Sequence, residues 1–580
     1  MNNREISRIL FEIGEYLAME NTPFKPQAYN RAGAVIKNLD EEISEIYGRG
    51  GLKAVEALAG IGESIALKIE SLIKTGRLPY YEKLKKEMPV DLTELLRVEG
   101  LGPKRVKELY HRLKIKNIDE LALAAGQGKV RNLEGFGEKT EKNILRGIEF
   151  VRKSGQRFVL GWLMPEIKKI EEGLRKIKEA RLVSSAGSTR RRKETVGDID
   201  ILAASNDPKP IIDYFVSMKG VGYVYAKGKT KAAIRIEPGV DVDLRVVVPQ
   251  SYGAALLYFT GSKNHNIALR KLAQEKGFKL NEYGLFKGNR RIAGATEEEI
   301  YQKIGLAYIP PEIREDAGEI EAGLKNQLPA LVDYDDLKGD LQIQTTWSDG
   351  LSSIEEYIEA AQKMGLKYIA ITDHTKILAI ARGLDEKRIE KQGKEIDRIN
   401  LRSQKQKSPF RVLKGTECDI LKDGGLDLSD DILEKLDIVG ASVHSYFNLS
   451  KEEQTKRIIK AMENKNVDII FHPTGRIINQ REGLKLDIEA IIKTAKKTGA
   501  ALEINAYPDR LDLKDEYIRK CVISGVRLSI SSDAHSVDHL PYLEWGIAQA
   551  RRGWAQKTDI INAWPIERML KYLKNKKITK

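Results

Sequence analysis

Hydrophobic residues follow three patterns along the chain. The first 150 residues show helical spacing, from MNNREISRILFEIGEYL at the start to SIALKIESLIKTG at 64–76. Short β-type runs follow, RLVSS at 181–185 and VDVDLRVVV at 240–248. From residue 337, apolar runs such as YIAIT, DIVGASV and ALEIN alternate with amphipathic helical stretches. This alternation is typical of a parallel α/β barrel.

Composition narrows the class of protein. The 580 residues are enough for several domains, and 41% hydrophobic with 31% charged residues is ordinary for a globular protein. No apolar run reaches the roughly 20 residues that a membrane span needs. The N-terminus has no signal-type apolar segment, and two cysteines fit a reducing compartment. We therefore expect a cytoplasmic protein without a membrane partner.

Positive charge is concentrated in the first part of the chain. Residues 1–315 carry a formal charge of +13, whereas residues 316–580 carry only +1. Lysine and arginine neutralise phosphates and release counterions, so a basic region favours a polyanionic partner such as nucleic acid. The alternative is a basic surface that only keeps the protein in solution.

One short motif recurs three times in the helical region, as LAGIG at 58–62, VEGLG at 98–102 and LEGFG at 133–137. Glycine permits positive φ and close approach of another chain. The N–H groups of such a turn and of the following helix form an anion site, as a helix–hairpin–helix needs to hold a DNA phosphate. A single GxG also occurs in ordinary helix connections. The predicted phosphate contacts are Gly60, Gly62, Gly100, Gly102, Gly135 and Gly137.

Carboxylates line up on two predicted strands. Asp198 and Asp200 in GDID share one strand face, because side chains two apart project together. A second strand carries Asp241 and Asp243, which also share a face. Close carboxylates repel unless a divalent cation lies between them, and the arrangement suits a two-metal site for phosphoryl transfer. A lone DxD is often a solvated strand edge, but the preceding Gly-Ser and basic run strengthen the catalytic interpretation.

Residues 1–315 resemble a family X DNA polymerase, the group that includes DNA polymerase beta. The resemblance rests on GS at 187–188, GDID at 197–200, VDLRVV at 242–247 and YFTGS at 258–262, with three hairpin motifs in the same order. It implies that Asp198, Asp200 and Asp243 bind two Mg²⁺ (or Mn²⁺) ions. Spacing does not choose between Asp241 and Asp243, and the family pattern VDLR chooses Asp243.

The resemblance also implies a nucleotide site. Ser188 and Arg191 contact the triphosphate, with Arg190 acting electrostatically nearby. The nucleotide-binding set is Gly187, Ser188, Arg191, Gly197, Tyr258, Phe259, Gly261 and Asn266, and Arg270 matches a template contact. The chain departs from the family by having Lys263, Asn264 and His265 before Asn266, and we expect His265 to be structural or stacking rather than catalytic.

Lys68 matches the family's lyase lysine, one helical turn beyond the first hairpin. An amine with a depressed pKa can attack an aldehyde sugar to form a Schiff base. Taken alone, Lys68 would be an ordinary surface lysine. Ser64 stands where better-known members carry another basic residue, which is a departure at this site.

Polar residues cluster at the ends of the barrel strands, where barrel active sites lie. Four of the seven histidines fall there, together with acidic residues. A single buried histidine is usually structural, whereas this set predicts a polynuclear site for Zn²⁺ or Mn²⁺. The predicted ligands are Asp349, His374, Glu417, His444, His472, Asp533 and His535.

Residues 337–570 resemble a PHP (polymerase and histidinol phosphatase) domain of the bacterial and archaeal type, through TDH, GTE, SVH, HPTGR and SDAH. This resemblance implies a phosphoesterase or 3′–5′ exonuclease. The family opens with HxH, where this chain has Gln342 and Gln344. An amide oxygen is a poorer ligand for Zn²⁺ or Mn²⁺ than imidazole. By the family's pattern one metal would keep only Glu417 and Asp533, a second Glu417, His444 and His472, and a third Asp349, His374 and His535. We therefore expect some metal binding but weak or absent hydrolysis.

The predicted architecture is multidomain, α+β and α/β: a helical helix–hairpin–helix region, a nucleotidyltransferase palm with a mixed sheet, a small α/β thumb-type subdomain and a distorted (β/α) PHP barrel. The expected domains are 1–84 (lyase-like, first hairpin), 85–155 (two hairpins), 156–248 (palm), 249–315 (nascent-base-pair-binding, thumb-type), 316–336 (linker) and 337–580 (PHP).

The predicted function is gap filling in DNA repair by a monomeric, DNA-directed DNA polymerase that takes gapped or primer-template DNA and dNTP. The alternatives are a nuclease or phosphoesterase using the PHP site and a noncatalytic repair scaffold. The missing HxH argues against the first alternative, and the GS…DxD…D set argues against the second. A template-independent nucleotidyltransferase would share the latter set, but would not need three hairpins.

Overall fold

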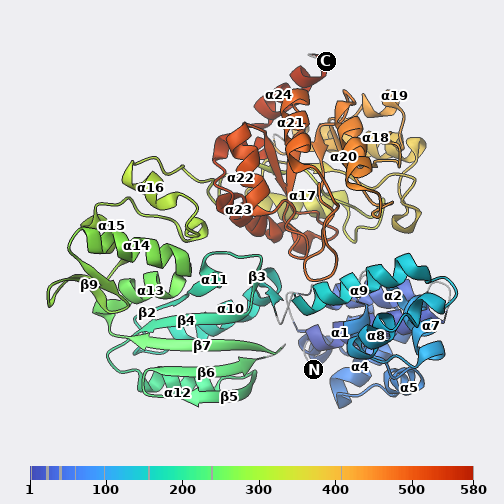
Figure 1. Ribbon diagram of the computed structural model, residues 1–580. Helices are drawn as coiled ribbons and strands as arrows, with labels where there is room; N and C mark the ends of the chain where they lie inside the picture. Colours follow the sequence, from blue (N-terminus) through green and yellow to red (C-terminus); the bar gives the residue numbers. More distant parts are fainter. Residues whose placement is uncertain are drawn as a thin grey trace. The chain divides into compact units, whose positions relative to one another are not determined.

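Figure 1 shows the protein as a computed structural model. The structure describes residues 1–580 except 2, 21–24, 38, 40–41, 59, 97, 99, 154–156, 237–238, 407 and 579–580. The chain divides into two compact units. One comprises Met1–Gly155 with Ile477–Glu482, and the other comprises Gln156–Arg476 with Gly483–Lys580.

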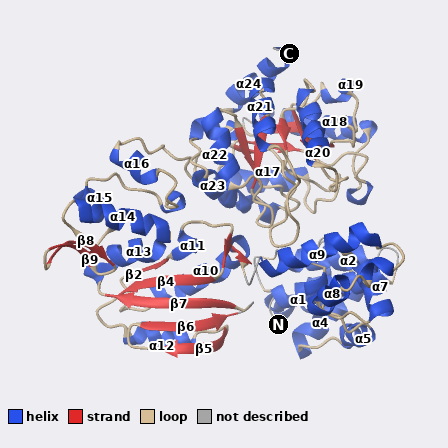
Figure 2. Ribbon diagram, in the orientation of Figure 1, coloured by secondary structure: helices blue, strands red, loops and turns tan. Residues whose placement is uncertain are grey.

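The first unit is built from helices (Figure 2). They are α1 (Asn3–Met19), α2 (Lys25–Lys37), α3 (Ile43–Glu56), α4 (Glu63–Thr75), α5 (Pro79–Glu87), α6 (Leu92–Leu95), α7 (Pro103–Leu113), α8 (Ile118–Gly126) and α9 (Gly137–Lys153), with a 3-10 turn at Val130–Asn132. On α1, Ile6, Leu10 and Ile13 recur at helical spacing and are fully buried. The apolar faces of these helices join one core, which confirms the helical prediction.

The palm opens the second unit with a mixed sheet. The sheet has the order β2-β4-β7-β6-β5, in which β4 and β7 are parallel and the other neighbours antiparallel. Its strands are β2 (Leu182–Ser185), β4 (Asp198–Ala204), β5 (Val221–Lys227), β6 (Lys231–Ile236) and β7 (Val240–Val247). The other palm elements are β1 (Phe158–Val159), α10 (Leu160–Arg175), α11 (Gly187–Arg190), β3 (Thr195–Val196) and α12 (Lys209–Ser217). The prediction of a mixed sheet is therefore confirmed.

The thumb-type subdomain combines helices with a small antiparallel sheet of order β10-β9-β8. Its elements are a 3-10 turn (Pro249–Ser251), α13 (Tyr252–Thr260), α14 (Lys263–Glu275), β8 (Lys279–Asn281), β9 (Gly284–Lys287), β10 (Arg290–Ala293), α15 (Glu297–Ile304) and a 3-10 turn (Pro311–Ile313). The predicted linker at 316–336 contains α16 (Glu319–Leu324), and its Val332 is buried in the barrel core.

The C-terminal part is a parallel sheet whose strands are neighbours in chain order. They are β11 (Gly339–Asp340), β12 (Tyr368–Ile371), β13 (Arg411–Asp419), β14 (Ile438–Ser442), β15 (Ile469–Ile470), β16 (Ala501–Asn505) and β17 (Leu528–Ser531). A parallel bridge between Ile343 and Ala534 joins the segments that follow the first and last strands, so the sheet is a nearly closed barrel. This finding confirms the predicted α/β barrel.

Helices accompany the barrel strands, as the right-handed crossovers of parallel strands require. They are α17 (Ile354–Lys363), α18 (Glu386–Lys405), α19 (Asp430–Leu433), α20 (Lys451–Glu463), α21 (Ile488–Thr498), α22 (Asp515–Ser524), α23 (Leu543–Arg552) and α24 (Ile566–Ile578). The 3-10 turns are Ala379–Ala381, Val537–Tyr542, Lys557–Asp559 and Ile561–Ala563.

Ion pairs and hydrogen bonds join the palm, the thumb-type subdomain and the barrel inside the second unit. At the end of α23, Arg552 donates from Nη1 to the carbonyl oxygen of Arg191 (2.8 Å) and to Glu315 Oε1 (3.1 Å). Arg476 donates to both carboxylate oxygens of Glu194, at 3.2 and 2.6 Å. Two arginines of the barrel therefore bind the segment 191–194, which follows α11.

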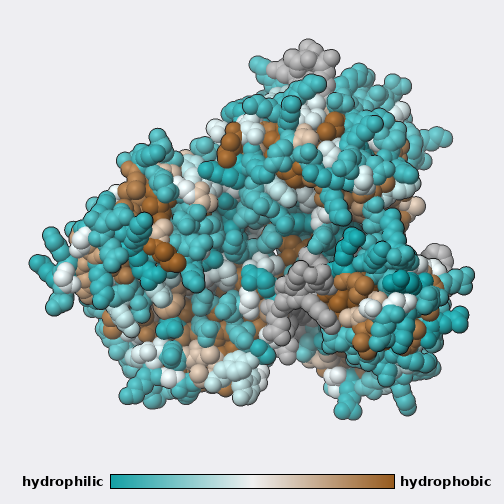
Figure 3. All heavy atoms as spheres, viewed as in Figure 1, coloured by the Kyte–Doolittle hydropathy of each residue, from teal (hydrophilic) through white to brown (hydrophobic). Residues whose placement is uncertain are grey.

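The surface of the molecule is mostly hydrophilic on the face that Figure 3 shows, and hydrophobic residues form small patches there. Among the described residues, no helix has the length and apolar character needed to cross a membrane.

Candidate active sites

The three hairpin turns in the first unit repeat one backbone geometry. Gly60, Gly100 and Gly135 have φ of +89°, +85° and +79°. In each turn the next residue donates its N–H to the carbonyl of the residue three positions earlier, at 3.0–3.1 Å. Those donors, Ile61, Leu101 and Phe136, are buried and anchor each turn to the core. The positive φ gives a physical reason for glycine at the third position of each motif.

The second glycine of each motif stands where the next helix begins. Gly62 and Gly102 cap α4 and α7, and Gly137 is the first residue of α9. A Cβ placed on any of these three would meet no atom within 4 Å. Free N–H groups at a helix N-terminus attract anions, so these turns can admit a phosphate at close range. Phosphate binding by the six glycines stays a prediction.

Lys68 lies on α4 and turns toward Ser64. Its Nζ donates to the carbonyl and to the hydroxyl of Ser64, both at 2.9 Å. The same Nζ lies 5.8 Å from the ring centre of Tyr29 and 5.6 Å from that of Tyr80. Burial, with a smaller contribution from Lys25, lowers the pKa of Lys68. A lowered pKa increases the fraction of free amine, which a Schiff-base nucleophile requires.

The palm brings three predicted carboxylates together. β4 alternates, so Ile199 is fully buried while Asp198 and Asp200 lie on the other face. In the parallel pairing of β4 with β7, Asp200 stands opposite Asp243 and Asp198 stands opposite Asp241. Register therefore places side chains from positions more than 40 residues apart on one face of the sheet.

Burial and, after it, mutual repulsion disfavour the charged forms of two of these carboxylates. Burial, together with Asp198 and Asp243, raises the pKa of Asp200 from 3.8 to about 6. Burial and Asp198 also raise the pKa of Asp243. Carboxylates held together against their repulsion fit divalent cations, because oxygen ligands of this kind are what Mg²⁺ prefers.

Asp241 and Asp243 have different surroundings in the structure, although spacing alone did not distinguish them. Asp241 accepts two hydrogen bonds from Arg235, from Nε at 2.7 Å and from Nη2 at 3.0 Å. This ion pair lowers the pKa of Asp241. The Asp241 charge is thus compensated by protein, whereas the Asp243 carboxylate faces Asp198 and Asp200.

Gly187 lies against the carboxylate group at the start of α11. It has φ of +58°, and a Cβ there would lie 2.3 Å from Asp200 Oδ2. Ser188 follows on the same short helix and is partly exposed. At Gly197, by contrast, a Cβ would approach only Arg157, at 3.8 Å. Glycine is therefore sterically required at Gly187 but not at Gly197.

The two arginines after Ser188 have different surroundings. Arg190 makes two hydrogen bonds to Glu297, at 2.8 and 2.7 Å, and Arg314 binds the same carboxylate at 2.6 Å. The Arg190 charge is therefore largely neutralised by a buried acid. Arg191 donates to the Thr260 carbonyl and to Glu315 Oε1 (3.1 Å), so its guanidinium lies beside α13.

Tyr258 and Phe259 end α13 with their rings edge to face, 5.2 Å apart. The Arg245 guanidinium lies 4.6 Å from the Phe259 ring centre. Gly261 follows with φ of +69°, and a Cβ there would lie 3.2 Å from Arg191 Nη1. Asn266 Nδ2 donates to the Tyr258 carbonyl at 2.7 Å, so Asn266 lies beside the end of α13.

His265 is structural in this fold. Lys263, Asn264 and His265 form the first turn of α14, and His265 is fully buried. Its ring nitrogens contact Glu319 Oε1 at 2.6 Å and the Tyr301 hydroxyl at 3.1 Å. Arg270, the predicted template contact, is exposed on the same helix.

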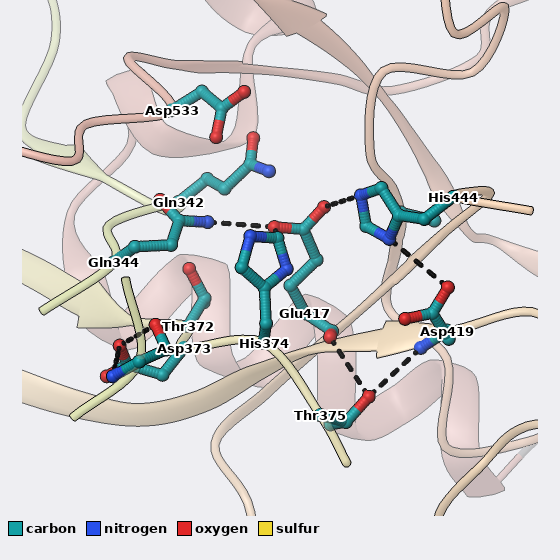
Figure 4. Close-up of polar contacts among 12 residues, drawn as sticks. Gln342, Gln344, Thr372, Asp373, His374, Thr375, Glu417, Asp419, His444 and Asp533 are labelled. Carbon is teal, nitrogen blue, oxygen red and sulfur yellow. Dashed lines mark hydrogen bonds and ion pairs between the residues drawn. The ribbon is translucent and has the colours of Figure 1, made fainter. Parts of the chain in front are cut away.

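The predicted ligands of the barrel lie around Glu417, which stands near the C-terminal end of β13. His444 Nε2 and His472 Nε2 lie 3.2 and 2.8 Å from Glu417 Oε1, and His374 Nδ1 lies 3.4 Å from Oε2. Figure 4 shows His444 and Gln344 on opposite sides of this carboxylate. Burial opposes ionisation, yet the surrounding histidines hold the pKa of Glu417 well below its usual range.

Within the described residues, two groups have three ligand atoms that all lie within 4.8 Å of one another, and the palm aspartates, which share a sheet face, are not among them. The two groups are Asp349–His374–His535 and His374–Glu417–His444. The first is the group expected from the sequence. In the second, His374 takes the place expected for His472. Imidazole and carboxylate suit Zn²⁺ or Mn²⁺, and the Nδ1 atoms of His374 and His472 are buried without a hydrogen-bond partner, so these residues fit a metal site.

The two glutamines are poorer metal ligands than the histidines of the family's pattern, and both make hydrogen bonds within the protein. Gln344 turns its amide nitrogen to Glu417 Oε2, 2.8 Å away, and so presents a donor where a cation would need an acceptor. Gln342 Oε1 accepts from Asn505 Nδ2 at 3.3 Å. Hydrogen bonds within the protein therefore take up Gln342 Oε1 and Glu417 Oε2, whereas Gln344 Oε1 is buried without a hydrogen-bond partner.

Sequence reasoning missed several polar residues of the barrel site. Asp419 lies 3.2 Å from His444 Nδ1, Asn505 donates to Asp533 Oδ2 at 3.1 Å, and Arg510 Nε lies 3.4 Å from the same oxygen. The signal for Asp419 was its spacing of two from Glu417 on one strand. Arg510 follows β16 in a loop, and no local pattern marks it.

Comparisons with known protein families match four segments of the chain. Residues 1–78 match a helix–hairpin–helix domain, 92–149 a SAM-like helix–hairpin–helix tandem, 255–315 a DNA polymerase beta thumb and 340–507 a PHP domain. A mixed-sheet palm with convergent aspartates, hairpins, this thumb and a PHP barrel together define a family X polymerase fused to a phosphoesterase-type barrel.

Similarity to individual proteins extends over the whole chain. The DNA polymerase/3′-5′ exonuclease PolX of Bacillus subtilis (strain 168) is 38% identical over 579 residues, covering 99% of this chain and all of that protein. The chain belongs to the family X DNA polymerases that carry a C-terminal PHP domain. A probable phosphatase of Thermoanaerobacter sp. (strain X514) is 31% identical over 39% of this chain and 89% of its own length. DNA polymerase lambda of Rattus norvegicus is 24% identical over 54% of this chain and 56% of its own.

Proposed function

We propose that the protein is a DNA-directed DNA polymerase that fills short gaps during DNA repair. The observation that carries this proposal is the convergence of Asp198, Asp200 and Asp243 on one face of the palm sheet. The raised pKa of Asp200 supports a site designed around cations. Membership of the family and the basic first part of the chain support DNA as the substrate.

The three carboxylates would hold Mg²⁺ or Mn²⁺, which activates a primer 3′-hydroxyl and stabilises charge on the transferring phosphoryl group. Ser188 and Arg191 would hold the triphosphate of the incoming dNTP, and this requires Arg191 to exchange Glu315 for phosphate. Tyr258 and Phe259 would flank the nucleotide sugar. A monomer acting on gapped or primer-template DNA in the cytoplasm is the simplest form of this proposal.

Primer extension across a one-nucleotide gap tests the proposal directly. Asp198→Ala and Asp200→Ala should each abolish nucleotide addition, because the cations lose a ligand, while affinity for gapped DNA changes little. Asp241→Ala is the matched control, since its carboxylate is paired with Arg235 and should leave extension measurable. Normal extension by either of the first two variants would contradict the assignment.

We propose a second, weaker role for the barrel as a phosphoesterase or 3′–5′ exonuclease impaired by Gln342 and Gln344. The two residue groups that fit a cation support retained metal binding, and the Gln344–Glu417 hydrogen bond supports the impairment. Degradation of a 3′ overhang with Mn²⁺ should be slow. Rapid degradation that is lost in His374→Ala but kept in Asp198→Ala would refute the impairment.

A further inference from the structure

Two tyrosine rings stand exposed on the outer strand of the palm sheet. Tyr223 and Tyr225 on β5 are 60% and 49% exposed, and their ring centres lie 4.9 Å apart at 71°. Tyr223 is paired with Arg235 and the Arg235 guanidinium lies over the Tyr225 ring, so both side chains lie on one side of the strand. A pair of adjacent exposed aromatic rings is a typical feature of a binding surface.

The pair lies on the same face of the sheet as the catalytic carboxylates. The Arg235 guanidinium is 5.4 Å from the Tyr225 ring centre, and Arg235 also binds Asp241 on β7. Asp241 shares its strand face with Asp243. β6 lies between β5 and β7, so the tyrosines are about 10 Å from Asp243 across two strand spacings.

The opposite face of this strand pair is covered along β6, whereas Val224 on β5 is 39% exposed. Ala232, Ile234 and Ile236 alternate along β6 and are buried, and α12 packs against β5 and β6. The tyrosines therefore do not belong to the palm core. Their rings are available to a molecule that lies across the face bearing the aspartates.

The surroundings of the pair favour a polyanion. Residues 221–236 contain four basic residues and no acidic residue. Lys227 is paired with Asp213, but Lys229 and Lys231 are exposed at the turn between β5 and β6. Aromatic rings next to cations are the combination that binds single-stranded nucleic acid, through base stacking and phosphate contacts.

A protein strand is a less suitable occupant of this edge. The pairing of β5 with β6 has two register shifts, between Val221 and Tyr223 and between Val224 and Ala226. Bulges of this kind twist an edge strand, and lysines oppose edge-to-edge pairing. The same lysines are favourable for a phosphate backbone.

We propose that Tyr223 and Tyr225 form a stacking platform for unpaired nucleotides of the DNA strand bound at the palm, with Lys229 and Lys231 contacting its phosphates. The platform rests on the proposed function in that DNA is the substrate. It adds a site for single-stranded bases, since only unpaired or terminal bases offer a free ring face.

Binding of single-stranded oligo(dT) to the full-length chain, measured by fluorescence anisotropy over a range of salt concentrations, tests the platform. Each of Tyr223→Ala and Tyr225→Ala should weaken binding by about fivefold or more, as expected for the loss of one stacked base. The dependence on salt should stay unchanged, because no charge is removed. The phenylalanine variants should bind like the original chain, because the ring is kept.

Matched variants separate stacking from charge. Lys229→Ala with Lys231→Ala should flatten the salt dependence, because fewer counterions are released. Tyr283→Ala removes an equally exposed tyrosine, 60% exposed in the thumb-type subdomain, and should change nothing. Thermal melting of each variant checks its fold.

Three results would overturn the platform: unchanged oligo(dT) affinity in both alanine variants, an equal loss in the phenylalanine variants, or an equal loss for blunt duplex DNA. All measurements can be made in an Asp198→Ala background, because binding needs no catalysis. The two proposals can fail separately. If the original chain did not extend a primer but still bound oligo(dT) through the tyrosines, only the proposed function would be refuted.

Discussion

Burial of Asp200, together with repulsion from the other palm aspartates, predicts that removal of its charge stabilises the metal-free protein. The pKa of Asp200 rises from 3.8 to about 6 on folding, so ionising this carboxyl opposes the native state. One pKa unit corresponds to about 1.4 kcal/mol, which makes the full effect about 3 kcal/mol. We expect Asp200→Asn to be more stable than the original chain by about that amount at pH 8 with a chelator present.

The sign of the pH dependence follows from linkage. Below pH 3.8 the carboxyl is protonated in both states and contributes nothing. Between pH 3.8 and 6 the unfolded chain ionises first, so the original protein loses stability as the pH rises, and above pH 6 the loss is constant. The advantage of Asp200→Asn should therefore shrink to about 0.5 kcal/mol at pH 4.

Urea unfolding followed by tryptophan fluorescence measures this difference. All five tryptophans of the chain lie in the second unit, so the signal reports the part that contains the palm. Mg²⁺ at pH 8 should stabilise the original chain more than the variant. Asp241→Asn is the control: the Arg235 ion pair lowers the pKa of Asp241, so this change should not stabilise. An Asp200→Asn advantage that is absent at pH 8, or larger at pH 4, would refute the reasoning.

Further predictions concern the other sites. Gly187→Ala should raise the Mg²⁺ concentration needed for half-maximal extension by about tenfold or more, because its Cβ would contact a catalytic carboxylate and its φ is positive; an unchanged requirement would contradict the steric argument. Glu297→Gln should lower the free energy of unfolding by about 3 kcal/mol, measured in urea, because it leaves buried arginines uncompensated. Lys68→Arg should eliminate borohydride trapping of a 5′-deoxyribose phosphate end, and trapping that persists would place the amine elsewhere. Gln342→His combined with Gln344→His should add about one tightly bound metal ion per chain by mass spectrometry and speed removal of 3′ nucleotides; an unchanged metal content would count against the impairment.

Local patterns predicted the parts of the fold that local physics determines. The glycine turns, the alternation on β4 and the strand–helix alternation of the barrel each follow from backbone preferences over a few residues, and the predicted fold class is confirmed. The domain boundaries and the residue roles stay predictions. Spacing could not choose between Asp241 and Asp243, because the deciding contact comes from Arg235 on the neighbouring strand.

Contacts between distant residues were beyond the sequence. Glu297 lies 107 positions from Arg190, and no periodicity connects them. His374 and His444 follow β12 and β14, and they meet Glu417 of β13 only because these strands end at one end of the barrel. Arg510 belongs to such a loop as well, and its proximity to Asp533 depends on closure of the whole sheet.

Through the hydrogen bonds of Arg552, the PHP barrel supports the segment to which we assign triphosphate binding. Arg552 binds the Arg191 carbonyl and the Glu315 carboxylate, and Glu315 in turn pairs with the Arg191 side chain. A polymerase fragment cut after residue 315 would thus lose the contacts that hold Arg191, the arginine proposed to bind the triphosphate. The polymerase part and the barrel are consequently unsuited to exchange between proteins. A chimera with a different barrel would need a residue that replaces the contacts of Arg552 with Arg191 and Glu315.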